Sequence, residues 1–129
     1  MNNNSVKVLK YSLLAGAVYF FCISIVHVLG VKVPGLFIYY NIPSHQYQDS
    51  IISFLAFGWA AFFYTASQFP HAVKPVLLSS IVALLGLIHI NLSTDFSAIA
   101  GAVSTVPFWI QVSLLFVYVS ELMFFSVRV

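Results

Sequence analysis

Residues 11–29 read "YSLLAGAVYFFCISIVHVL", 19 positions without an Asp, Glu, Lys or Arg. An α-helix of about 20 apolar residues is long enough to cross the ~30 Å hydrocarbon core of a bilayer. Apolar and polar residues do not alternate in this stretch, as they would in a strand of a membrane β-barrel. The stretch therefore predicts a transmembrane helix, with bounds near residues 8–29.

Three more apolar stretches follow and set the fold class. They predict helices at about 50–67, 75–90 and 106–125. Of the 129 residues, 61% are hydrophobic and 6% are charged, whereas soluble domains carry about 25% charged residues. We therefore predict an all-α integral membrane protein, a four-helix up-and-down bundle that forms a single domain over 1–129. The segment 31–49 is predicted to be an interfacial or re-entrant loop.

Helix-start signals refine these bounds. Pro75 and Pro107 lie near the predicted starts of the third and fourth helices, where proline is well tolerated because the first amide donors have no partner inside the helix. Asp49 and Thr105 are placed to cap the second and fourth helices with their side-chain oxygens.

Basic residues predict the orientation in the membrane. Lys7, Lys10, Lys74 and Arg128 fall on one side of the four-helix arrangement, and Lys32 falls on the other. Cytoplasmic loops carry the excess of lysine and arginine. Both termini are therefore predicted to be cytoplasmic. The basic residues form no cluster, so no nucleic-acid partner is expected.

Histidines in the first and third predicted helices are the first candidates for a site, because ionisable groups inside a membrane are costly. His27 and His89 lie near the non-cytoplasmic ends of their helices, each on a face with small residues, which favours helix contact over lipid contact. We expect both imidazoles to point into the bundle. They could bind haem b axially, or a metal together with Asp49 or Asp95. Alternatively, they are interfacial histidines that bond to the backbone.

Glu121 is the candidate buried ionisable group of the last helix. It lies about one turn from the cytoplasmic end. It is expected either to reach the interface and pair with Arg128 or Lys10, or to be a carboxyl that carries protons.

The stretch "LFIYYNIPSHQYQDS", residues 36–50, is rich in tyrosines and polar side chains. Tyrosines at this level are typical membrane-interface anchors. If the loop folds over the mouth of the bundle, however, its polar groups converge with the histidines on a small-molecule site. The candidate ligand-binding residues are then His27, His89, Tyr39, Tyr40, Asn41, His45, Gln46 and Asp49.

No phosphate-binding loop, serine-hydrolase elbow, HExxH or CxxC pattern occurs in the chain, so no catalytic residue is predicted. The first hypothesis is a non-catalytic subunit or assembly partner of a membrane complex, without a cofactor, that forms a homo-oligomer or joins a larger assembly in the lipid bilayer. The alternative is a site for a quinone, lipid or bis-His haem, built on His27, His89 and the 39–49 loop. A second alternative is an oligomeric transporter or channel.

Overall fold

The computed structural model describes residues 3–129, and this part of the chain is helical without a β-sheet. The elements in chain order are α1 (Asn3–Leu29), α2 (Gln46–Gln68), the 3-10 helix η1 (Pro70–Ala72), α3 (Val73–Ser93), α4 (Phe96–Ala100) and α5 (Val106–Val127). Within residues 3–129, α1, α2, α5 and the continuous stretch from η1 through α3 form four spans that are long and apolar enough to cross a membrane. The protein is therefore a small multi-pass membrane protein, and the predicted fold class is confirmed.

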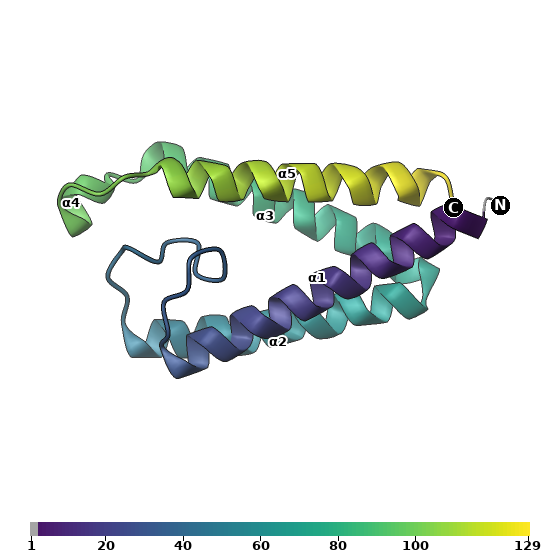
Figure 1. Cartoon of the computed structure of the whole chain (residues 1–129), viewed down its shortest axis with the longest axis horizontal. Coiled ribbons are helices and arrows are strands. Elements are labelled where there is room, and N and C mark those ends of the chain that lie inside the picture. The colour runs from purple at the N-terminus through teal and green to yellow at the C-terminus, as the bar shows by residue number, and fades with distance from the viewer. Residues whose placement is uncertain (1–2) are drawn as a thin grey trace.

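The four long helices pack as two pairs, α1 with α2 and α3 with α5 (Figure 1). The pairs lie close together at the end that carries both termini, called the termini end below. They diverge towards the opposite end, where the 30–45 loop lies between them (Figure 1). We call this opposite end the loop end.

The termini end is closed by a core to which every long helix contributes. This core is one cluster of buried side chains. Its fully buried members are Leu13 of α1, Phe63 of α2, Val76 of α3 and Leu122 of α5. Helices in lipid associate mainly through close van der Waals packing and interhelical hydrogen bonds rather than through the hydrophobic effect. This layer therefore holds the two pairs together where they meet.

A smaller core lies at the loop end. It consists of Ile42 from the loop, Phe96 from α4 and Phe108 from α5, with Tyr39 packed against it. The loop is thus packed against the α3–α5 pair and fills part of the space between the two helix pairs.

The start of α2 differs from the prediction. The helix begins four residues earlier than expected, its N-cap is His45, and Gln48 Oε1 accepts a hydrogen bond from the His45 backbone N–H. The predicted cap by Asp49 is wrong, because this residue lies inside the first turn and is buried. A carboxylate in the first turn is still favourable there, because the helix dipole is positive at its N-terminus.

The connection between α3 and α5 contains a short helix, α4, that the sequence reading did not include. The Asp95 side chain caps it by accepting hydrogen bonds from the backbone N–H groups of Ser97 and Ala98. A further hydrogen bond from the Ser97 hydroxyl, with these backbone bonds, lowers the pKa of Asp95 below its ordinary value. Thr105 is the N-cap of α5 as predicted, but its side chain makes no capping bond.

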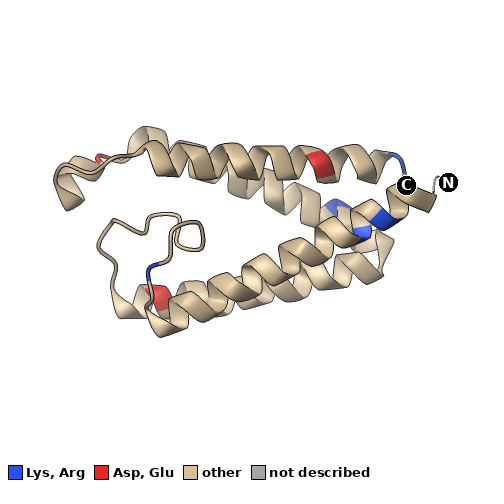
Figure 2. Ribbon diagram, in the orientation of Figure 1, with Lys and Arg blue, Asp and Glu red and all other residues tan. Residues whose placement is uncertain are grey.

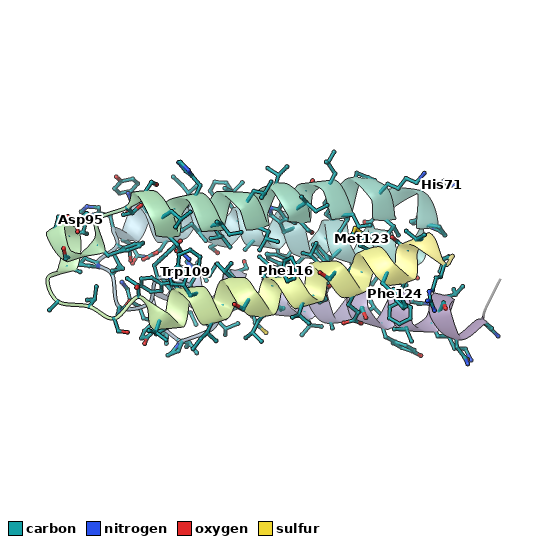
Figure 3. All side chains as sticks on the ribbon, turned by 90° about the horizontal axis from the view of Figure 1, so that it is seen from above. His71, Asp95, Trp109, Phe116, Met123 and Phe124 are labelled. Carbon is teal, nitrogen blue, oxygen red and sulfur yellow. The ribbon has the colours of Figure 1, made fainter. Side chains whose placement is uncertain are left out.

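Charged residues gather at the two ends of the molecule. Figure 2 shows most of the lysines and arginine at the termini end, with a single lysine, Lys32, in the loop at the other end. His71 of η1 and Asp95 also mark opposite ends (Figure 3). The structure thus places both termini at one end of the bundle, and the cytoplasmic assignment of that end stays a prediction from the basic residues.

Candidate functional site

A pocket of about 500 Å³ lies at the loop end, between the α1–α2 pair and the loop that follows α1. Its volume falls within the ~300–1,000 Å³ of typical small-molecule sites. The wall is mostly apolar and is formed by Phe20, Ile23, His27, Leu36, Phe37, Ile38, Tyr39, Ile42, Pro43, Ser44, Asp49, Ile52, Leu55, Ala56, Trp59, Ile90 and Phe96. The few polar side chains in this wall decide what the pocket can bind.

His27 supplies one of these polar groups from the last turn of α1. Its side chain is buried, and its Nδ1 lies 2.9 Å from the backbone oxygen of Ile23. A carbonyl oxygen only accepts, so Nδ1 must donate, and in the neutral ring Nε2 then carries the lone pair. Within residues 3–129, Nε2 has no hydrogen-bond partner. The imidazole is held flat against Phe37 of the loop, with ring centroids 3.6 Å apart.

Asp49 supplies the second polar group from the first turn of α2. The residue is 5% exposed. Its Oδ2 accepts a hydrogen bond of 2.9 Å from the Ser44 hydroxyl. Its Oδ1 is buried and has no partner in the described part of the chain. Leaving a buried acceptor unpaired costs about 1–3 kcal/mol, so a donor that reached Oδ1 would recover this free energy.

The loop that covers the pocket is fixed to α1 and α5 by a polar network. Tyr19 of α1 donates to the Gly35 backbone oxygen at 2.6 Å, and Gln111 of α5 donates to the same oxygen at 3.2 Å and to the Tyr19 hydroxyl at 2.6 Å. Gly35 has a φ of +87°, which favours glycine at this turn. Lys32 also donates to the Ile42 backbone oxygen across the loop. The cover is therefore tied to helices of both pairs.

Tyr39 joins the loop to the α3–α5 pair. Its ring packs against Phe96 and Phe108, and its hydroxyl donates to Asn91 Oδ1 at 2.9 Å. Burial raises the pKa of the Tyr39 phenol, so this group stays a neutral donor. Asn41 donates to the Ser104 backbone oxygen at 3.4 Å, which adds a bridge from the loop to the segment that precedes α5.

Of the eight predicted ligand-binding residues, the pocket wall contains His27, Tyr39 and Asp49. The other five do not line it: Tyr40, Asn41, His45, Gln46 and His89. His45 and Gln46 are exposed at the start of α2, and the His45 ring stacks on Tyr47 with centroids 5.7 Å apart. The folded loop thus brings three of the eight candidates into one pocket wall, and ligand binding by these residues stays a prediction.

The expectation that both imidazoles face the bundle interior holds for His27 and is wrong for His89, which is exposed on α3. The face of small residues that suggested burial is itself open, since Val82 is 61% exposed and nothing lies within 4 Å of a Cβ placed on Gly86. A haem held by both histidines stays a prediction, and the pocket wall contains one of its two ligands. Among residues 3–129 there is no group of three or more His, Cys, Asp or Glu side chains that could hold a metal ion.

Glu121 lies at the termini end, away from the pocket. It accepts a hydrogen bond of 2.6 Å from the Ser12 hydroxyl, and Tyr118 donates to the Ser12 backbone oxygen at 2.7 Å. The guanidinium of Arg128 lies 3.8 Å from the centroid of the Phe124 ring. Within the described residues Glu121 therefore has a serine partner rather than the predicted Arg128 or Lys10, and it joins α5 to α1.

Sequence reasoning missed Ser44 and Phe37, which respectively hold the carboxylate and the imidazole of the pocket. Both lie in the 36–50 stretch, but a single serine or phenylalanine carries no signal until the loop is folded. Comparison with protein-family models, with curated proteins and with solved structures finds no match to this chain.

Proposed function

We propose that the protein binds one small amphipathic molecule of the membrane in the pocket at the loop end. The apolar body of the molecule lies between α1, α2 and the loop, and its polar end meets Asp49 and His27. The observation that carries this proposal is the buried Oδ1 of Asp49, which has no partner in the described chain although Asp49 lines a pocket of about 500 Å³.

A carboxylate kept only for structure would be paired, because buried polar groups in folded proteins nearly always have hydrogen-bond partners. Asp49 has one partner for two oxygens. The Ser24–Ser53 contact between α1 and α2 is such a paired case, since both residues are buried and Ser53 donates to the Ser24 backbone oxygen at 2.8 Å. This contrast supports a binding role for Asp49.

The route into the pocket also fits a membrane ligand. Ile52 and Leu55 line the pocket and are 42% and 56% exposed on α2. In a bilayer, exposed apolar side chains of a spanning helix face the acyl chains. An apolar molecule can therefore reach the pocket sideways from the lipid, without moving its hydrophobic part through water.

The test is native mass spectrometry of the protein released from detergent after incubation with a total membrane lipid extract. We expect one bound molecule per chain. Ile52→Trp narrows the pocket and should lower the bound fraction at least several-fold. Ile51→Trp is the matched control, because Ile51 is 45% exposed next to Ile52 but does not line the pocket. No bound molecule, or equal loss in both variants, would refute the proposal.

The hypothesis of a non-catalytic subunit or assembly partner concerns oligomeric state and is compatible with ligand binding. It stays a prediction. The formation of a homo-oligomer and a role as a transporter or channel also stay predictions. Lipid and quinone remain the chemical classes proposed for the ligand, with haem b as the cofactor alternative.

A further inference from the structure

At the loop end of the pocket, the two polar side-chain atoms without a partner in the described chain are both hydrogen-bond acceptors. Oδ1 of Asp49 is a buried carboxylate oxygen. Nε2 of His27 is an acceptor in the neutral ring, because Nδ1 is bonded to the Ile23 carbonyl oxygen and must carry the proton. Both residues are 5% exposed, and the Oδ1 atom of Asp49 is itself buried.

The two side-chain hydroxyls of the pocket wall, those of Ser44 and Tyr39, are already engaged. The Ser44 hydroxyl donates to Asp49 Oδ2, and the Tyr39 hydroxyl donates to Asn91 Oδ1. The Lys32 ammonium donates to the Ile42 backbone oxygen, and Lys32 does not line the pocket. A ligand group that can only accept would therefore face these two acceptors, and burying it there would leave it and them unpaired.

The polar end of the pocket is confined to the loop end. His27 lies in the last turn of α1 and Asp49 in the first turn of α2, and these two helices are packed together. Trp59 also lines the pocket, but it comes ten residues after Asp49 on α2, which is ~15 Å along the helix. Its indole N–H thus belongs to the apolar half, where Trp59 stacks on Phe20.

From this arrangement we propose that the ligand carries a head group with at least two hydrogen-bond donors, either hydroxyls or an ammonium. Its donors bond to Asp49 Oδ1 and His27 Nε2. Head groups made only of acceptors, such as ketones, esters and oxidised quinones, are rejected, and so are anionic head groups. This inference rests on the proposed binding function and names the class of ligand for the same pocket.

The test measures dissociation constants for four probes with the same dodecyl chain: 1,2-dodecanediol, dodecylamine, 2-dodecanone and dodecanoate. The reporter is the fluorescence of Trp59 in a Trp109→Phe background, since the chain has two tryptophans. The protein is held in lipid nanodiscs. We expect the diol and the amine to bind at least about tenfold more tightly than the ketone and the dodecanoate. Tighter binding of dodecylamine than of the diol would show that an ammonium head group is preferred. Equal binding would show that two hydroxyls satisfy the pocket as well as an ammonium does.

Asp49→Asn should remove most of the preference for donors, because the substituted amide replaces one carboxylate oxygen by an NH₂ group. Asp95→Asn is the matched control, since Asp95 lies at the same end but caps α4, and the preference should persist there. Ser44→Ala keeps both carboxylate oxygens of Asp49 and should also keep the preference, which separates loss of the Ser44–Asp49 hydrogen bond from loss of the acceptor Oδ1.

Two results would overturn the inference, and they differ from failure of the proposed function. If all four probes bind equally and all are lost in Ile52→Trp, the pocket binds ligands but does not select donors. If the preference for the diol and amine survives in a folded Asp49→Asn protein, Asp49 does not select the head group. If no probe binds, the proposed function fails together with this inference.

Discussion

At the scale of single residues, Gly16 decides how closely α1 meets its neighbours. A Cβ placed there would lie 2.5 Å from Phe63 Cδ1 and would also overlap the Tyr118 hydroxyl. Tyr118 has little freedom to move, because its hydroxyl donates to the Ser12 backbone oxygen. Glycine is therefore required at this position by the close approach of α2 and α5.

Gly16→Ala should lower the free energy of unfolding by about 1–3 kcal/mol, the usual cost of overpacking a core. The effect is measured by thermal unfolding in detergent. Gly58→Ala is the control, because a Cβ there meets nothing within 4 Å. Equal stability of the two variants would contradict the close approach seen at Gly16.

At the scale of elements, the loop between α1 and α2 is a fixed cover rather than a free connection. The Gly35 backbone oxygen accepts from Tyr19 and from Gln111, and the Phe37 ring lies flat on His27. Because Phe37 lines the pocket, any loosening of this segment opens the site. The hydrogen bonds to Gly35 thus connect α5, which does not itself line the pocket, to ligand binding.

Gln111→Leu should speed hydrogen exchange of the Phe37 amide, which donates to the Val33 backbone oxygen. We expect about three- to tenfold faster exchange, equivalent to the ~0.5–1.5 kcal/mol of one net hydrogen bond. Ser113→Ala is the control, because Ser113 is exposed on the same helix and donates to the Trp109 backbone oxygen of its own turn. Unchanged exchange in Gln111→Leu would show that the Gln111 bond is not needed to hold the loop.

At the scale of the whole molecule, a closed termini end and an open loop end create the site. The fully buried layer at the termini end holds the two helix pairs together, and the pairs diverge from there (Figure 1). The outer surface of α5, including Phe116 and Met123 (Figure 3), is exposed and apolar, as expected of a face in contact with lipid.

The predicted orientation can be tested with single cysteines in a Cys22→Ala background, since Cys22 is the one cysteine of the chain. His71→Cys marks the termini end and Ala98→Cys the loop end. A membrane-impermeant maleimide should label His71→Cys only in inside-out vesicles and Ala98→Cys only in right-side-out vesicles, following the positive-inside rule. The reverse pattern would invert the orientation, and labelling of both from one side would refute the four-span topology.

The sequence by itself determined that this is a helical membrane protein with four spans, because length and hydropathy are local properties of each segment. It also placed the polar loop residues and His27 near one end of the bundle. Helix bounds were less accurate, as at α2, because capping at His45 depends on a contact with Gln48 that propensity alone does not reveal.

Only the tertiary structure decided which faces turn inward. In lipid, apolar residues are favourable on every side of a helix, so periodicity does not distinguish a packed face from a lipid-facing one. His27 and His89 have similar surroundings in sequence, yet one is buried against Phe37 and the other is exposed. The difference arises because α1 packs closely along α2 beneath the folded loop, whereas the loop end of α3 lies apart from that pair. The pocket, with its unpaired Asp49 oxygen, follows from this asymmetry.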